Sequence, residues 1–140
     1  MSFHIEHRLD DRHQRTGTFA SRGEAVLAAL RLKTTPVLII GGDDSVSPGD
    51  GAVVAVVLKR GEVVTAGAEP AWWSSISEAS RKKLLAGGRL DTDVVADVTD
   101  AGGGVAATAW ENGPMDEWEL TPAEDHNWVR VEAARRDVQR

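Results

Sequence analysis

Four large aliphatic residues follow one another without a break at Val37-Leu38-Ile39-Ile40. Pro36 precedes this run and two glycines follow it, so residues that favour turns bound it on both sides. A short, unbroken apolar run of this kind is typical of a strand that is covered on both faces. We therefore expect a sheet in which this segment is a central strand.

Alternating patterns and β-branched runs predict further strands around this one. The segment 3–9 alternates apolar and polar side chains, and 16–19 is suited to return as its antiparallel partner after an exposed turn at 10–15. Arg60-Gly61 has the turn chemistry of a tight hairpin. The expected strands are 3–9, 16–19, 37–40, 52–59, 62–66, 93–98 and 105–110.

The first expected helix covers 22–32. Ser21 is followed three residues later by a glutamate, which makes a capping box in which each side chain can satisfy a backbone N–H at the helix start. The spacing of Val26, Leu27 and Leu30, with the alanines between them, predicts one apolar face that packs on the core.

Two more helices are expected in the second half of the chain. Ser75 begins a second capping box, and the helix after it ends naturally at Gly87. At 121–124 the residues are Thr-Pro-Ala-Glu, with a capping residue, a proline at the first helical position and a glutamate, so a helix should run to about Val138. Alternation at 128–132 also fits a short strand, but the start signal favours the helix.

The length and composition indicate one globular domain. A chain of 140 residues with a mean hydropathy of -0.27 and 27% charged residues is typical of a folded protein that buries one core. Hairpins alternate with helices along the chain, which favours segregated α and β structure. We expect a single α+β domain over 1–140, with a mainly antiparallel sheet and about three helices packed on one face.

Cysteine content and charge exclude several classes of function. With no cysteine, the chain has no disulfide, thiolate zinc site, iron–sulfur cluster or cysteine nucleophile. The formal net charge of -6 argues against binding to nucleic acid, which depends on neutralising phosphates. No apolar run approaches the roughly 18 residues of a membrane span, and no leader follows Met1, so we expect a cytoplasmic protein.

A glycine-rich loop after the apolar strand carries Asp43, Asp44 and Asp50. Carboxylate oxygens suit hard cations, so these residues are candidate ligands of Mg²⁺ or Ca²⁺. The spacing differs from that of an EF-hand, and the loop lacks the Gly-Lys-Ser/Thr ending of a P-loop. A divalent-metal-dependent hydrolase or phosphotransferase is the resulting alternative function, beside the simpler interpretation of a solvent-exposed connection.

Histidines offer few catalytic arrangements. His4, His7 and His13 lie in the first hairpin among acidic residues, but His4 and His7 point to opposite faces of a strand and do not converge on a metal. We interpret this segment as a solvated polar strand face. His126 lies beside Asp125 in the first turn of the last helix, and no Gly-x-Ser-x-Gly elbow is present. The sequence therefore predicts no catalytic residue and no resident cofactor.

Five tryptophans and no tyrosine give the chain an unusual aromatic content, and all five lie in the second half. Trp72 and Trp73 are adjacent and cannot easily face one core from a regular segment, so we expect at least one to be partly exposed. Accessible aromatic side chains are common anchors of protein interfaces. The alternative is that the tryptophans fill the core where small residues leave gaps. The predicted partner-binding residues are Trp72, Trp73, Met115 and Trp118.

These features favour a small, non-catalytic protein-interaction module of bacterial type, such as an immunity-like inhibitor or a regulatory binding protein. An acidic chain fits a partner with a basic surface, because complementary charge accelerates association. A small-ligand binding domain is a further alternative, since such pockets use ordinary apolar residues between a sheet and its helices.

Overall fold

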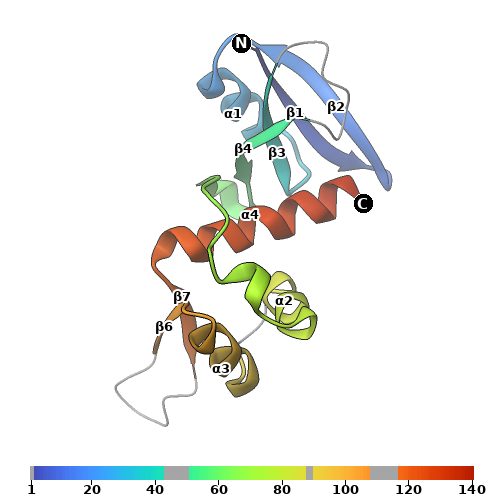
Figure 1. The fold of residues 1–140 in the computed structure, drawn as a ribbon. Coiled ribbons are helices and arrows are strands. Elements are labelled where there is room, and N and C mark those ends of the chain that lie inside the picture. The colour runs from blue at the N-terminus through green and yellow to red at the C-terminus, as the bar shows by residue number, and fades with distance from the viewer. Residues whose placement is uncertain (1, 43–50, 88–89, 108–116) are drawn as a thin grey trace. The chain divides into compact units, whose positions relative to one another are not determined.

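The computed structural model describes residues 2–42, 51–87, 90–107 and 117–140. Its architecture is α+β, as the sequence predicts, with a five-stranded antiparallel sheet, a two-stranded sheet and four α-helices in these ranges (Figure 1). Residue contacts divide the chain into two compact units, and the single domain over 1–140 stays a prediction. Unit 1 comprises Met1–Ala66 and Ala134–Arg140, and unit 2 comprises Gly67–Ala133.

Five strands form the sheet of unit 1 in the order β2-β1-β3-β4-β5, and every neighbouring pair is antiparallel. The apolar run at 37–40 lies in β3, at the middle of the sheet, and its four side chains are fully buried. This confirms the expected central strand. The strands are β1 (Ser2–Leu9), β2 (Arg12–Phe19), β3 (Val37–Gly42), β4 (Ala52–Val57) and β5 (Val63–Thr65).

The turns of the two hairpins use residues with positive φ. Asp10 and Asp11 form the turn between β1 and β2 with φ of 51° and 61°, which aspartate tolerates better than most residues. The expected turn at 10–15 is therefore too long, because 12–15 continues the ladder of β2. The 3₁₀ turn η1 (Lys59–Gly61) connects β4 and β5, which confirms the hairpin predicted at Arg60-Gly61.

Helix α1 (Arg22–Leu30) begins at the predicted capping box and packs on one face of this sheet. The Ser21 hydroxyl accepts a hydrogen bond from the Glu24 amide at 3.1 Å, and the Glu24 carboxylate accepts one from the Ala20 amide at 3.3 Å. The core between helix and sheet is aliphatic and consists of Ile5, Ala25, Ala29, Val37, Ile39, Ala55 and Val57.

The last helix, α4 (Ala123–Gln139), follows the predicted start signal and confirms the expected terminal helix. Its residues up to 133 belong to unit 2 and its end belongs to unit 1. In unit 1, Gln139 Nε2 donates to Glu6 Oε1 at 3.4 Å, and Glu6 points to the face opposite Ile5. The end of α4 therefore contacts the face of the unit 1 sheet opposite α1.

Unit 2 contains two short helices and a two-stranded sheet beside the first part of α4. The segment 93–98, expected as a strand, is helical instead. The Asp91 carboxylate accepts a hydrogen bond from the Val94 amide at 2.9 Å, and Val94 and Val98 share one buried helical face. The elements are η2 (Trp73–Ser75), α2 (Glu78–Leu85), α3 (Thr92–Asp100), β6 (Gly104–Ala107) and β7 (Trp118–Thr121).

Two local predictions in unit 2 are corrected by this arrangement. The cap of α2 is Ser77, whose hydroxyl accepts a hydrogen bond from the Ser80 amide at 3.1 Å, whereas Ser75 belongs to η2. Strand β6 pairs with β7 and not with 93–98. Among the helices of the described ranges, none has the length and apolar character that crossing a bilayer requires.

Candidate functional site

The adjacent tryptophans of unit 2 are both buried, so the expectation that one is partly exposed is wrong. Trp72 is 4% exposed and Trp73 6%. The reason is the 3₁₀ turn that starts at Trp73, because successive side chains in a tight turn need not point to opposite sides. Both rings pack in a core with aliphatic residues from α2, α3, β7 and α4.

Specific contacts hold this aromatic core. Trp72 Nε1 donates to the Asp125 carboxylate at 2.9 Å. The rings of Trp73 and Trp128 meet edge to face, with centroids 5.0 Å apart. The side chains of these tryptophans are therefore engaged in contacts within unit 2. Of the remaining predicted partner-binding residues, Trp118 is partly buried on β7, and Met115 lies outside the described residues.

The candidate metal ligands Asp43, Asp44 and Asp50 also lie outside the described residues, so the Mg²⁺ or Ca²⁺ site and the hydrolase or phosphotransferase hypothesis stay predictions. In the part of the chain that the structure describes, no group of three His, Asp or Glu side chains is arranged to hold a metal ion.

A buried carboxylate lies at the centre of a polar cluster in unit 1. Glu6 is fully buried, and its Oε2 accepts a hydrogen bond from Arg15 Nη2 at 2.8 Å. Its Oε1 pairs with His13 Nε2 and receives the longer bond from Gln139. The Arg15 guanidinium and the hydrogen bonds from the other two side chains compensate the cost of removing this carboxylate from water. The interpretation of a solvated strand face is therefore wrong for this segment, since the end of α4 covers it.

The two histidines of β1 are buried as well. His7 lies between Thr16 Oγ1, 3.1 Å from its Nε2, and Thr34 Oγ1, 3.2 Å from its Nδ1. Burial lowers the pKa of His7, because the imidazolium form loses hydration. His4 Nδ1 donates to the carbonyl oxygen of Gly17 at 3.1 Å. These side chains connect β1 to β2 and to the loop before β3, so their hydrogen bonds serve the fold.

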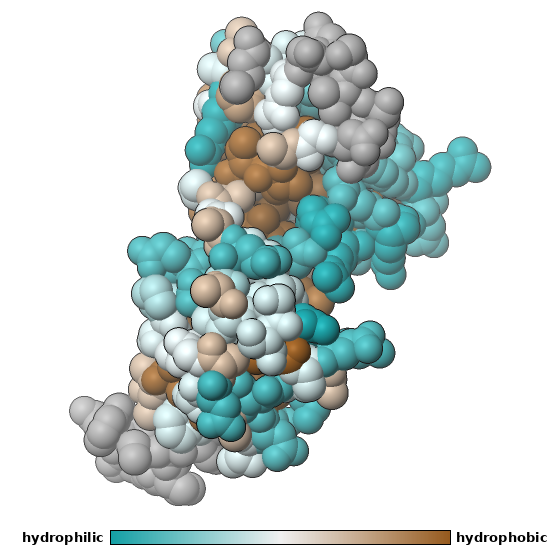
Figure 2. All heavy atoms as spheres, in the orientation of Figure 1, coloured by the Kyte–Doolittle hydropathy of each residue, from teal (hydrophilic) through white to brown (hydrophobic). Residues whose placement is uncertain are grey.

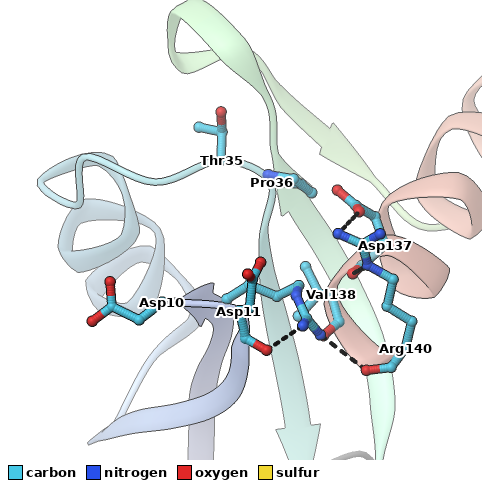
Figure 3. A pocket seen from close by; sticks show the side chains of 8 residues that line it. Asp10, Asp11, Thr35, Pro36, Asp137, Val138 and Arg140 are labelled. Carbon is cyan, nitrogen blue, oxygen red and sulfur yellow. Dashed lines mark hydrogen bonds and ion pairs between the residues drawn. The ribbon is translucent and has the colours of Figure 1, made fainter.

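A pocket of about 360 Å³ lies at the turn of the first hairpin, within unit 1 (Figure 3). The Arg8 guanidinium is engaged there, since it donates to the carbonyl oxygens of Arg140 at 2.9 Å and of Asp11. Arg140 in turn pairs with Asp137 at 3.3 Å. Small-ligand sites are mostly apolar, whereas this lining is mostly charged. It consists of Arg8, Asp10, Asp11, Thr35, Pro36, Asp137, Val138 and Arg140.

Large apolar side chains are exposed on α1 and β5. Leu27 is 59% exposed, Leu30 43% and Val63 40%. Leu27 and Leu30 are neighbours on the helix, and a Cβ atom added to Gly61 would lie 3.4 Å from Leu30 Cδ2, so Leu30 lies beside the turn that leads into β5. We call Leu27, Leu30 and Val63 the α1–β5 surface. In Figure 2, apolar side chains of unit 1 reach the surface where Figure 1 places β4, the partner strand of β5.

The sequence interpretation missed this surface because it placed Leu27 and Leu30 on the buried face of the helix. The most buried residues of α1 are Ala25 and Ala29, at 0% and 2% exposed. The small alanine side chains let α1 approach the sheet closely. Leu27 and Leu30 then lie on the part of the helix that faces away from the core and stay exposed. The four-residue spacing of these alanines was the signal that identifies the buried face.

Comparisons with models of known families, with curated proteins and with solved structures gave no match to this chain.

Proposed function

We propose that this chain is a non-catalytic protein-interaction module that binds its partner through the α1–β5 surface. The observation that carries the proposal is the exposure of Leu27, Leu30 and Val63 beside a sheet whose central apolar run, 37–40, is fully buried. Apolar side chains that gather on a surface mark interaction sites, since covering them releases about 25 cal/mol per Å² of apolar area.

The polar residues of unit 1 support a function without catalysis. Glu6 and His13 pair with each other, and His7 is held between two threonine hydroxyls. General acid–base catalysis needs a titratable group within hydrogen-bond reach of a substrate. These groups face other residues of the fold instead, which favours binding over chemistry.

We further propose that the module is an immunity-like inhibitor or a regulatory binding protein, and the support for this is the charge of unit 2. Unit 2 contains 5 Lys and Arg against 13 Asp and Glu, a formal net charge of -8. A basic surface on the partner would be attracted to unit 2 and would accelerate association. The α1–β5 surface would supply the apolar contacts that lower the dissociation rate.

The test compares affinity capture by three versions of the full chain from a lysate of the source organism. The double variant Leu27→Ser/Leu30→Ser removes the exposed leucines from α1. The matched control is Leu9→Ser, which changes a leucine that is 42% exposed at the end of β1. Circular dichroism establishes that each variant is folded.

We expect a stoichiometric protein partner that the wild type and Leu9→Ser retain and that the double variant loses. A partner held equally by all three proteins would contradict the assignment of the surface. If no protein is retained by the wild type, the interaction module itself is rejected.

A further inference from the structure

The last strand of the unit 1 sheet has main-chain groups that point outward. Val64 lies opposite Val56 in β4, and the Ala66 amide donates to a carbonyl oxygen of β4 at 3.0 Å. Bonding positions alternate along an antiparallel ladder, so the residues between them point their N–H and C=O away from the partner strand. The backbone groups of Val63 and Thr65 therefore face an edge of the sheet beyond which the described part of the chain places no further strand.

The side chains at this edge point to the face that α1 covers. Val63 lies opposite Val57, which belongs to the core under α1, and Thr65 Oγ1 accepts a hydrogen bond from Arg22 Nη2 at 2.9 Å. In a strand added along β5, every second side chain would point to the same face. Apolar side chains at these positions would cover the α1–β5 surface.

Basic side chains outnumber acidic ones beside this edge, where Glu62 is the acidic residue between η1 and β5. Lys59 and Arg60 lie in η1, immediately before β5, and Arg31 and Lys33 follow α1; all four side chains are exposed. The position of Leu30 beside Gly61 brings the end of α1 next to η1. Unit 1 contains 11 Lys and Arg against 9 Asp and Glu, a net charge of +2, in contrast to unit 2. The local charge therefore favours an acidic occupant.

We propose that an extended, acidic segment of a partner protein binds as an additional strand on β5. Its main chain pairs with Val63 and Thr65, its alternate apolar side chains cover the α1–β5 surface, and its carboxylates face Lys59 and Arg60. Strand addition of this kind obtains affinity from main-chain hydrogen bonds and specificity from alternate side chains. This inference rests on the proposed function and names the chemistry of the partner.

The probe is a fluorescein-labelled decapeptide of alternating glutamate and valine, whose binding to the full chain is followed by fluorescence anisotropy. We expect saturable binding that weakens as salt rises, and no binding of the peptide in which lysine replaces each glutamate. Lys59→Glu/Arg60→Glu should weaken binding about tenfold or more. The control Lys82→Glu reverses an exposed charge of unit 2 and should leave the affinity unchanged.

A second pair of variants tests the strand. Val63→Pro removes an outward N–H and leaves the bonds to β4 intact, and Glu62, with φ of -70° and ψ of 125°, already has a conformation that precedes proline readily. Val63→Thr keeps the N–H. We expect Val63→Pro to weaken peptide binding about fivefold relative to Val63→Thr, as the loss of one hydrogen bond of about 1 kcal/mol implies.

Equal affinities of the two Val63 variants, or no binding of the acidic peptide to the wild type, would overturn the proposal. Tighter binding of a ten-nucleotide single-stranded DNA or of phosphatidylglycerol vesicles would assign the surface to a different ligand and overturn it too. So would a dimer in sedimentation that Val63→Pro abolishes, since a second copy would then occupy the edge. The proposed function would still hold after any of these outcomes if the lysate experiment shows a protein partner whose capture requires Leu27 and Leu30.

Discussion

The core of unit 1 is aliphatic, whereas that of unit 2 is centred on tryptophans. In unit 1, a five-stranded sheet satisfies its main chain by strand pairing, and Ala25 and Ala29 bring α1 close to it. In unit 2 the strands have four residues each, and Trp72 and Trp73 fill the space between short elements. A regular sheet can thus be covered by small residues, but short irregular elements need large side chains to make a core.

Charge differs between the units as well. Unit 1 is slightly positive and buries a carboxylate, Glu6, against the Arg15 guanidinium, whereas unit 2 carries a net charge of -8. All five tryptophans belong to unit 2. Tryptophan fluorescence therefore reports on unit 2, and far-ultraviolet circular dichroism reports on both units, which makes the comparison measurable.

The largest expected effect concerns the buried carboxylate of unit 1. Glu6→Gln removes the buried charge that pairs with the Arg15 guanidinium, and breaking such a pair costs about 3–5 kcal/mol. We expect urea unfolding followed by circular dichroism to show this loss, with a smaller shift in the fluorescence transition. Glu119→Gln, an exposed position on β7, is the control. A change below about 0.5 kcal/mol for Glu6→Gln would mean that the cluster contributes little stability.

An intermediate effect is expected in the aromatic core of unit 2. A Cβ atom at Gly103 would lie 2.5 Å from Val98 Cγ1 and 2.9 Å from Trp72 Cδ1, so Gly103→Ala should cost about 1–3 kcal/mol through overpacking. The fluorescence midpoint in urea measures it. At Gly67 an added Cβ has no neighbour within 4 Å, and Gly67→Ala should be nearly neutral. Equal midpoints for the two variants would show that the tryptophan core is loosely packed.

The smallest expected effect is a pH dependence confined to unit 1. Burial lowers the pKa of His7, so the unfolded chain takes up a proton at a higher pH than the folded chain does. The stability that neutral His7 contributes is fully present above the unfolded pKa of about 6.5. It is lost as the pH falls through the lower pKa of the folded chain. Between pH 7.5 and 5.5, the circular dichroism midpoint should fall more for the wild type than for His7→Gln. Parallel profiles would exclude His7 as the cause.

Local signals predicted the elements that begin with a clear cap or consist of an unbroken apolar run. The capping box at Ser21, the run at 37–40 and the start of α4 all produced the expected element. The segment 93–98 failed because its β-branched valines favour a strand, whereas the Asp91 cap and the spacing of Val94 and Val98 favour a helix. In this segment the cap and the helical spacing outweigh the β-propensity of the valines.

The candidate site was less accessible to sequence reasoning. At least one of Trp72 and Trp73 is expected to be partly exposed, because a regular segment would separate them, whereas a 3₁₀ turn places both in the core. Leu27 and Leu30 were assigned to the core because they are apolar, and the closer approach of alanines to the sheet leaves them exposed. In both cases the sequence does not show which side chains of an element are buried by the rest of the fold.

By itself, the sequence determined the α+β class, the central strand, the N-terminal cap of α1 and the terminal helix, because each depends on residues close together in the chain. Only the tertiary structure decided that Glu6 and His7 are buried, that two tryptophans share one core and that the edge of β5 lies beside exposed leucines. Burial depends on which distant elements pack together, and periodicity within one element does not specify its neighbours.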